Sequence, residues 1–194
     1  PLRIESQVQL MVFDREGRLW IAGPMGVAYR DGDEFVPVQG VSASSALSLY
    51  VDRAGDVLIG TRFSGLIRHH EGSFSRLTSI HGLSNDTVTA LYQDEHGSLW
   101  IGTSEGGLNL LKDGKVTQFQ ERDGLYDNKV FTIVEDGVGN LWMGSARGIW
   151  RVAKRDLEAF ARGERAHFRS VSYDQGDRLR SFSLSNPGFF QPSC

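Results

Sequence analysis

Short runs of strand-forming residues alternate with turn residues along most of the chain. Four apolar stretches each lead into an aspartate: VQLMVF, ALSLYV, VTALYQ and VFTIVE. An Asp-x-x-Gly pattern follows, which is typical of a tight hairpin because Asp can bond its own backbone and Gly accepts a positive φ. A second apolar run comes next and ends at another glycine. The pattern therefore predicts antiparallel hairpins built from buried strands.

One string recurs four times along the chain: DREGRLWIAG at 14–23, DRAGDVLIG at 52–60, DEHGSLWIG at 94–102 and DGVGNLWMG at 136–144. Its leading aspartates lie 38, 42 and 42 residues apart, a period typical of the four-stranded blades of β-propellers. A third strand is expected after each second glycine, and a fourth carries Phe35, Phe74 or Phe119 in three of the copies. The sequence therefore predicts an all-β fold of about four propeller blades, each with four antiparallel strands.

The repeat also sets the expected domain organisation, which is one partial propeller. We expect blades at 8–45, 46–87, 88–129 and 130–185, with the end of a preceding blade at 1–7 and the start of a next blade at 186–194. Within the last blade, residues 156–162 predict one short helix with Asp156 as its N-cap and Gly163 just beyond its end. Because the sequence begins without Met, we expect a segment of a longer chain.

The tryptophans of the repeat hold one register. Trp20, Trp100 and Trp142 occupy the same position, and Leu58 replaces them in the second copy. A buried aromatic side chain covers on the order of 150 to 250 Å², so we expect these residues to wedge each blade against the next. Stacking on a carbohydrate is the alternative.

Composition narrows the function classes. With 40% hydrophobic residues, 23% charged residues and a formal net charge of −3, the chain is not disordered, and we expect no contact with nucleic acid or a membrane. The single cysteine, Cys194, excludes an internal disulfide and a cysteine-based zinc site. The histidines show no metal-binding spacing, and His69 and His70 are expected at a solvated strand end. We therefore expect no cofactor, no metal and no catalytic residue in this segment.

The combination of D-x-x-G-x-L-W-I-G, a following G-G-L or G-I turn and the linking GLSNDTV at 82–88 resembles the two-component regulator propeller repeat. The resemblance covers nearly the whole chain and departs from the family's pattern after Gln175. It implies a fragment of a seven-bladed propeller, the periplasmic sensor region of a bacterial receptor. The histidine kinase or diguanylate cyclase activity would then belong to the parent protein, and this segment would not itself be an enzyme.

The variable loops are where function is expected on this scaffold. Loops between second and third strands and links between blades should fall on the same rim, where they can bind a small molecule or glycan. Arginines could clamp an anionic or sugar ligand, aromatic rings could stack on it, and polar side chains could hydrogen bond to it. The candidate ligand-binding residues are Arg62, Phe63, Asn85, Glu105, Tyr126, Asn128 and Arg147. An ordinary hydrated rim is the alternative.

Two other functions stay open from the sequence. Similar repeats occur in enzymes on propeller scaffolds, such as streptogramin-lyase-like or glycan-active proteins, which would require a His/Glu cluster at the channel mouth. A purely structural scaffold is the second alternative. Because four blades leave edges and apolar faces uncovered, the expected partners also include the remaining propeller blades of the parent chain and further copies of this segment.

Overall fold

The computed structural model describes residues 8–23, 26–39, 41 and 45–173, and they form four sheets of four strands each. Blade 1 contains β1 (Leu10–Phe13), β2 (Leu19–Gly23), β3 (Gly26–Asp31) and β4 (Glu34–Pro37). Blade 2 contains β5 (Ala46–Val51), β6 (Val57–Thr61), β7 (Leu66–His70) and β8 (Ser73–Leu77). Blade 3 contains β9 (Val88–Gln93), β10 (Leu99–Thr103), β11 (Leu108–Lys112) and β12 (Lys115–Phe119). Blade 4 contains β13 (Thr132–Glu135), β14 (Asn140–Ser145), β15 (Gly148–Ala153) and β16 (Val171–Tyr173).

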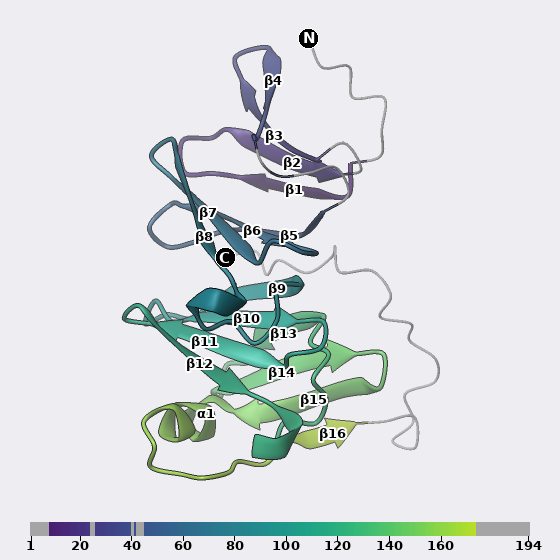
Figure 1. The fold of residues 1–194 in the computed structure, drawn as a ribbon, viewed down its shortest axis with the longest axis vertical. Coiled ribbons are helices and arrows are strands. Elements are labelled where there is room, and N and C mark those ends of the chain that lie inside the picture. Colours follow the sequence, from purple (N-terminus) through teal and green to yellow (C-terminus); the bar gives the residue numbers. More distant parts are fainter. Residues whose placement is uncertain (1–7, 24–25, 40, 42–44, 174–194) are drawn as a thin grey trace.

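The strand order in every blade follows the sequence, and neighbouring strands are antiparallel. Figure 1 shows the blades succeeding one another in chain order, from the purple blade 1 to the light green blade 4. The first strands of successive blades lie side by side, because β5 contacts both β1 and β9, and β9 contacts β13. The all-β prediction of four-stranded propeller blades is confirmed. The blade fragments expected at 1–7 and 186–194 lie outside the described residues.

The core consists of the apolar layers between blades. Trp20 is 0% exposed and shares a cluster with Ile59 of blade 2. Trp100 is equally buried and shares a cluster with Met143 of blade 4. Leu58 performs the same packing between blades 2 and 3. The wedge role predicted for this register therefore holds wherever another blade follows.

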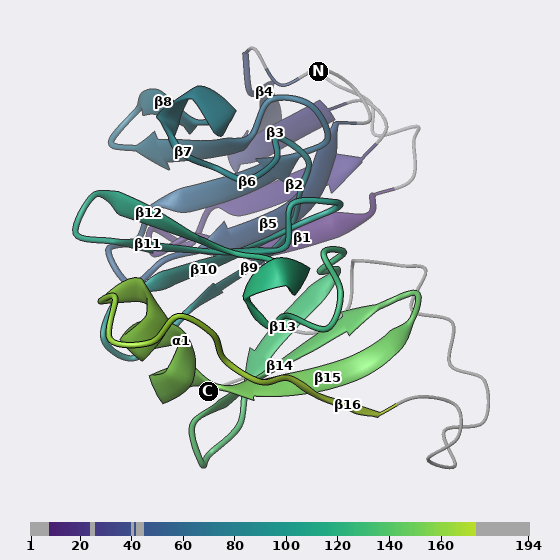
Figure 2. The same ribbon diagram turned by 60° about the horizontal axis from the view of Figure 1, so that its bottom comes forward.

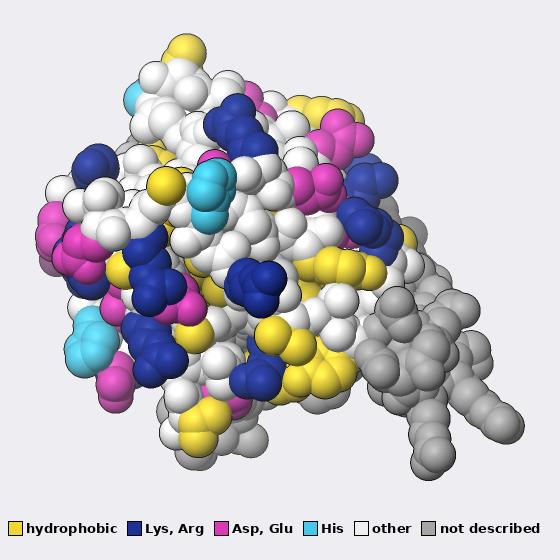
Figure 3. All heavy atoms as spheres, turned by 90° about the horizontal axis from the view of Figure 1, so that it is seen from below, with side chains coloured by type: hydrophobic (Ala, Val, Ile, Leu, Met, Phe, Trp, Pro, Cys, Tyr) yellow, Lys and Arg dark blue, Asp and Glu magenta, His cyan; other side chains and the backbone are white. Residues whose placement is uncertain are grey.

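The two ends of the row of blades present open faces. Trp142 holds the register of Trp20 and Trp100, but no blade follows it in the described structure, and its ring is only partly buried against Tyr173. On blade 1, the side chains of Met11 and Phe13 are each 66% exposed. Figure 3 views the molecule from the blade 4 end, where hydrophobic side chains lie among arginines and lysines. These faces are of the kind that a neighbouring sheet covers.

Helix α1 (Lys154–Ala161) corrects one detail of the sequence prediction. It begins two residues earlier than expected, and Ala153, not Asp156, is its N-cap. The reason is that the backbone amide of Lys154 donates to the carbonyl of Gly139 directly after β15 ends, which starts the helix at that point. Asp156 lies in the first turn instead and pairs with Arg165 at 3.1 Å. The expected Gly163 does follow the helix, with a φ of 76°.

The helix covers the outer junction between blades 3 and 4, beside the strands shown in Figure 2. Leu157 is 0% exposed, as predicted for the docking face of a helix too short to stand alone. Phe160 lies 5.6 Å from the ring of Phe119 on β12 and 5.5 Å from that of Phe168. Within the described ranges, no helix is both long enough and apolar enough to cross a membrane.

Candidate functional site

The loops of the molecule gather on two opposite ends of the blades. We name the end formed by the second-to-third-strand loops (61–65, 103–107 and 145–148) and the inter-blade links (78–88 and 120–130) the link rim. We name the end that carries the four aspartate turns, at 14–18, 52–56, 94–98 and 136–140, the turn rim. The link rim holds all seven predicted ligand-binding residues.

The loops of the link rim share one hydrogen-bond pattern. In blade 2, the amide of Thr61 donates to the carbonyl of Gly65 at 3.1 Å, and its hydroxyl accepts from the amide of Ser64. In blade 3, the amide of Thr103 donates to the carbonyl of Gly107 at 3.0 Å, and its hydroxyl accepts from the amide of Gly106. Threonine therefore closes both loops from within.

The links repeat a second pattern, which ties them to these loops. The 3-10 helices η1 (Ser79–His81) and η2 (Glu121–Asp123) open the two links. The amide of Gly65 donates to the carbonyl of Asp86 at 2.9 Å, and the amide of Gly107 donates to that of Asn128 at 2.8 Å. The side chains of Asp86 and Asn128 in turn accept from the first amides of η1 and η2. The two loop sets therefore lie on one rim, as predicted. We refer to these repeated bonds as the link frame.

Three of the predicted residues come together at the blade 4 side of the link rim. The guanidinium of Arg147 lies 4.7 Å from the centre of the Tyr126 ring and pairs with Glu121 at 3.1 Å. Asn128 accepts from the amide of Glu121 at 2.9 Å. Glu121 was missed by sequence reasoning, because nothing in the ERDG string marks a carboxylate that turns back towards the loop of the next blade.

The other four predicted residues lie on blades 2 and 3. Arg62 and Glu105 are exposed, and the ring of Phe63 is 77% exposed. Asn85 accepts from the amide of Thr87 at 2.8 Å, so it holds its own link. Arg62 and Arg147 belong to loops two blades apart, and Arg147 is already paired within the chain. Their joint role in clamping one ligand stays a prediction.

The turn rim is built on a pairing that the residue spacing could have revealed. In blades 1, 3 and 4 the repeat aspartate accepts two backbone amides of its own turn with one oxygen. Its other oxygen accepts from the indole of the tryptophan six residues later, at 2.8 Å from Trp20, 3.2 Å from Trp100 and 2.8 Å from Trp142. The amide of Asn140 and the indole of Trp142 hold the pKa of Asp136 well below its usual range. The tryptophans are therefore polar anchors as well as wedges.

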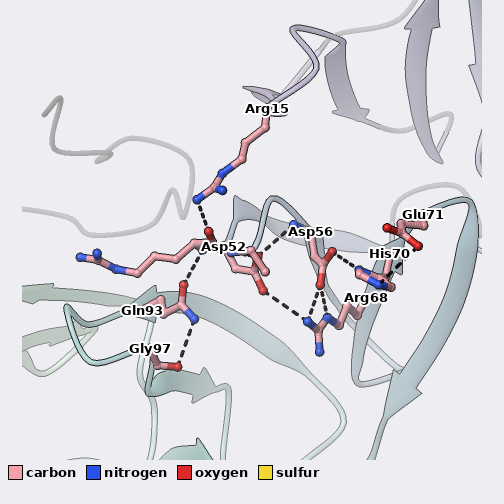
Figure 4. Close-up of polar contacts among 10 residues, drawn as sticks. Arg15, Asp52, Asp56, Arg68, His70, Glu71, Gln93 and Gly97 are labelled. Atoms are coloured by element: carbon pink, nitrogen blue, oxygen red, sulfur yellow. Dashed lines mark hydrogen bonds and ion pairs between the residues drawn. The ribbon is translucent and has the colours of Figure 1, made fainter.

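Blade 2 solves the same problem differently, as Figure 4 shows. Leu58 has no donor for Asp52, and a second carboxylate, Asp56, is 4% exposed beside it. The guanidinium of Arg68 reaches both carboxylates, at 3.8 Å from Asp52 and in close contact with Asp56. The ring of His70 bonds to Asp56 at 2.5 Å. The hydrogen bond to Asp56 raises the pKa of His70 above its usual value.

Contacts between blades also run along the turn rim. The side chain of Arg15 donates to the carbonyl of Arg53, and the amide of Arg53 donates to Gln93 at 2.7 Å. Gln93 donates in turn to the carbonyl of Gly97 at 3.1 Å. These contacts link blades 1, 2 and 3 and leave the carbonyl and amide groups that make them occupied.

A buried lysine joins blades 3 and 4 on the same rim. Lys154 lies 2.6 Å from Glu135 and 3.6 Å from Asp94, and Glu135 also accepts from the hydroxyl of Tyr92. Burial alone would lower the pKa of Lys154, but the hydrogen bond to Glu135 and both negative charges raise it, so the lysine stays charged. A cavity of about 280 Å³ lies beside Lys154 and Glu158. Two carboxylates already neutralise Lys154, and the lining of the cavity also carries the opposite charges of Arg155 and Glu158.

The histidine prediction needs one correction. His70 is exposed as expected, but His69 is only 8% exposed and packs 4.9 Å from Trp20 and 4.8 Å from Phe74. The reason is strand alternation, which turns His69 onto the face that blade 1 covers. Burial lowers its pKa. Among the residues that the structure describes, no group of three or more His, Cys, Asp or Glu side chains could hold a metal ion.

Comparison with known families and structures agrees with this architecture. Residues 82–105 match the family described as "Two component regulator propeller", which confirms the resemblance seen in the sequence. None of the curated proteins matches the chain significantly.

Solved structures show the same fold at low sequence identity. The extracellular domain of BT4673, a proposed hybrid two-component system from B. thetaiotaomicron, aligns with a TM-score of 0.68 at 17% identity. That alignment covers 86% of this chain and 25% of the other. Virginiamycin B lyase from Staphylococcus aureus aligns with a TM-score of 0.62 at 13% identity, over 87% of this chain and 56% of the lyase. A gluconolactonase from Xanthomonas campestris aligns with a TM-score of 0.53 at 16% identity, over 84% of this chain and 61% of the enzyme. The chain is therefore part of a propeller, and it spans about a quarter of the length of the BT4673 extracellular domain.

Proposed function

We propose that this chain is a non-catalytic recognition segment of an extracytoplasmic sensor propeller, whose link rim binds the signal. The observation that supports this most is the link frame. The same backbone bonds recur in the links 78–88 and 120–130, while the side chains exposed on them differ. A surface that is fixed in backbone and varied in side chain is suited to recognition.

Further parts of the proposal concern the whole protein. The likeness to extracellular domains of two-component systems supports a periplasmic location. A histidine kinase or diguanylate cyclase would then supply the output. We also propose that the remaining blades of the parent propeller cover the open faces of blades 1 and 4.

An enzyme is the second candidate, because a lyase and a gluconolactonase share the fold. The geometry of the described residues gives it less support. Three of the histidines among them are already engaged: His69 is buried, His70 is held by Asp56, and Nδ1 of His81 accepts from the amide of Thr78 at 3.1 Å. The hydroxyl of Thr78 also lies 2.9 Å from Nδ1 of His81, but the amide already occupies that nitrogen, so the pair lacks the free base that activates a nucleophile.

A thermal-shift screen of the purified chain against glycans and small anionic metabolites tests the proposal. We expect at least one compound to raise the melting temperature. Binding should weaken by at least about a hundredfold in a variant with Arg62→Ala and Arg147→Ala, since each charge-assisted hydrogen bond contributes roughly 1.5 to 3 kcal/mol and about 1.4 kcal/mol is a factor of ten. The matched control is Arg76→Ala on β8, an exposed arginine outside the link rim.

Two results would contradict the proposal. One is conversion of a streptogramin or a lactone at a rate that scales with protein concentration, which would favour the enzyme. The other is binding that is unchanged in the double variant, which would place recognition away from these arginines. A screen without any binding compound would favour a structural scaffold.

A further inference from the structure

Two large apolar side chains stand out from the link rim on blade 2. Phe63 is 77% exposed and Ile80 is 88% exposed. Met11 and Phe13 are also strongly exposed, but they lie on the open face of blade 1, where a neighbouring sheet would cover them, and Val138, which is 84% exposed, stands alone in the aspartate turn of blade 4. Phe63 and Ile80 belong instead to a loop and to η1. A missing neighbouring blade therefore does not account for them.

The link frame brings these two residues to the same place. The amide of Ser79, which precedes Ile80, donates to the carboxylate of Asp86 at 2.6 Å. On the loop that carries Phe63, the amide of Gly65 donates to the carbonyl of Asp86 at 2.9 Å. The hydroxyl of Thr87 also donates to the carbonyl of Arg62. Residues 62–65 and 79–80 thus flank one dipeptide, and we name Arg62, Phe63 and Ile80 the apolar rim patch.

Blade 3 shows that the fold does not require this patch. Glu105 holds the position of Phe63 in the equivalent loop, and Arg122 holds the position of Ile80 in η2. The bonds of the link frame recur around both pairs, although the bond from the Thr87 hydroxyl has no counterpart in blade 3, where Lys129 holds that position. Leaving a large apolar side chain in water forgoes roughly 1.5 to 3 kcal/mol of burial. Two such residues on either side of the Asp86–Thr87 dipeptide indicate a surface that another molecule covers.

The shape and charge of the patch indicate the kind of molecule. Small ligands bind in concave pockets, whereas Phe63 and Ile80 protrude. Aromatic and arginine side chains are typical anchors of protein interfaces. Arg62 is exposed and forms no ion pair with any residue that the structure describes. We propose that the apolar rim patch binds an extended segment of a partner protein, in which a large apolar side chain lies next to a carboxylate. This inference rests on the proposed function because it specifies a partner class for the same rim.

A repeat swap tests the inference without altering the fold. In the swap variant, Phe63→Glu and Ile80→Arg place the residues of blade 3 on blade 2. The swap should be tolerated because the link frame already carries both residues in blade 3. Random peptides displayed on phage are selected on the intact chain and, in parallel, on the swap variant. We expect the intact chain to enrich peptides with an aromatic or aliphatic residue beside Asp or Glu, and the swap variant to bind them at least about tenfold more weakly.

Two matched variants separate the contributions. Arg62→Ser, which installs the residue of Ser104, should remove the preference for Asp and Glu while keeping the apolar preference. Glu105→Phe with Arg122→Ile should create a second patch on blade 3 that binds the same peptides. Equal enrichment on the intact chain and the swap variant, or no enrichment on either, would overturn the inference.

The outcomes distinguish failure of this inference from failure of the broader proposal. A glycan or small anion that depends on Arg62 and Arg147, found without peptide enrichment, would overturn the inference and leave the sensor proposal standing. A glycan whose binding is lost in the swap variant would assign the patch to carbohydrate and would also overturn it. Peptide enrichment without any binding compound would support the patch and restrict the sensor proposal to protein signals.

Discussion

Blades 2 and 3 are the most informative pair of regions in the molecule. On the link rim they share every bond of the link frame, yet blade 2 exposes Phe63 and Ile80 where blade 3 exposes Glu105 and Arg122. On the turn rim the situation is reversed. There the backbone turns are alike, but Trp100 serves the aspartate of blade 3 while an arginine serves that of blade 2. The difference teaches that one set of bonds, repeated from blade to blade, fixes the loops of the link rim, whereas side-chain pairings that differ between blades fix the turn rim.

The largest expected effect tests how far the two links are equivalent. Gly82 and Gly124 end η1 and η2 with φ values of 104° and 123°. A Cβ at Gly82 would meet only the side chain of Val116 at 3.4 Å, whereas a Cβ at Gly124 would lie 1.9 Å from the carbonyl oxygen of Phe168. Gly82→Ala should cost about 1 to 2 kcal/mol for the left-handed backbone, and Gly124→Ala more than about 3 kcal/mol. Urea denaturation measures both free energies of unfolding. Equal losses would show that the backbone around Phe168 shifts to make room for the added methyl group.

The second prediction exchanges the two solutions of the turn rim. Trp100→Leu gives blade 3 the residue that blade 2 carries, and it should destabilise the chain by about 2 to 3 kcal/mol. The reasons are the lost packing of a side chain that is 0% exposed and the loss of the indole donor to Asp94.

A second variant separates the two causes of that loss. Trp100→Phe keeps an aromatic ring at the buried position but removes the indole donor to Asp94. It should cost about 1 kcal/mol less than Trp100→Leu because it retains more of the packing. Equal losses in the denaturation midpoint would mean that the missing hydrogen bond alone accounts for the change.

A third prediction separates the apolar surface of the rim from that of the blade ends. We propose that the purified chain associates through its open faces, because Met11, Phe13 and Val134 are exposed where internal blades are covered. Phe13→Glu with Val134→Glu should lower the association constant by about tenfold or more, while Ile80→Arg should leave it unchanged. Sedimentation velocity over a range of concentrations measures this. A monomer at all concentrations would contradict the proposal.

The smallest effect concerns the pH dependence of blade 2. Asp56 raises the pKa of His70 above its usual value of 6.5, so the folded state binds the proton more tightly than the unfolded state. The pair therefore stabilises the fold fully below pH 6.5, and the contribution is lost as pH rises through the raised pKa. Lys112 holds this position in blade 3, so His70→Lys should keep its charge throughout.

The measurement compares the free energies of unfolding of the wild type and His70→Lys from mildly acidic to mildly alkaline pH. As pH rises, the free energy of unfolding of His70→Lys should increase relative to that of the wild type. Comparing the two proteins cancels the buried His69, whose lowered pKa acts in the opposite direction. A difference that is constant with pH would show that His70 contributes no linked proton.

The repeat made most of the fold predictable. Each Asp-x-x-Gly turn fixes a hairpin locally, and the spacing of the four copies then implies stacked blades. The helix start was missed because the bond from Lys154 to Gly139 extends the pairing of β14 with β15, which the spacing around Asp156 does not reveal. His69 was missed because its burial depends on the neighbouring blade and not on its own strand end.

The candidate site was predictable only as a set of positions. The alternating direction of the strands places the seven residues on one rim, but it does not reveal which of their side chains already bond to other residues of the chain. Arg147 and Asn128 engage Glu121 through η2, whose fold depends on contacts with the next blade. Ile80 was not selected at all, because an apolar residue between two polar ones in the string SIH resembles an ordinary buried position until its exposure is known.

The link frame has a consequence for how such proteins can diversify. A backbone amide donates every bond of the link frame, and the acceptors are carbonyls or the side chains of threonine, Asp86 and Asn128, so a codon change at the side chain of Phe63 or Ile80 should leave the scaffold intact. Duplicated units can then drift separately, each acquiring its own chemical character while its neighbours keep theirs. One ancestral repeat can in this way give rise to proteins that bind unrelated molecules while the four-stranded sheets beneath the loops stay the same.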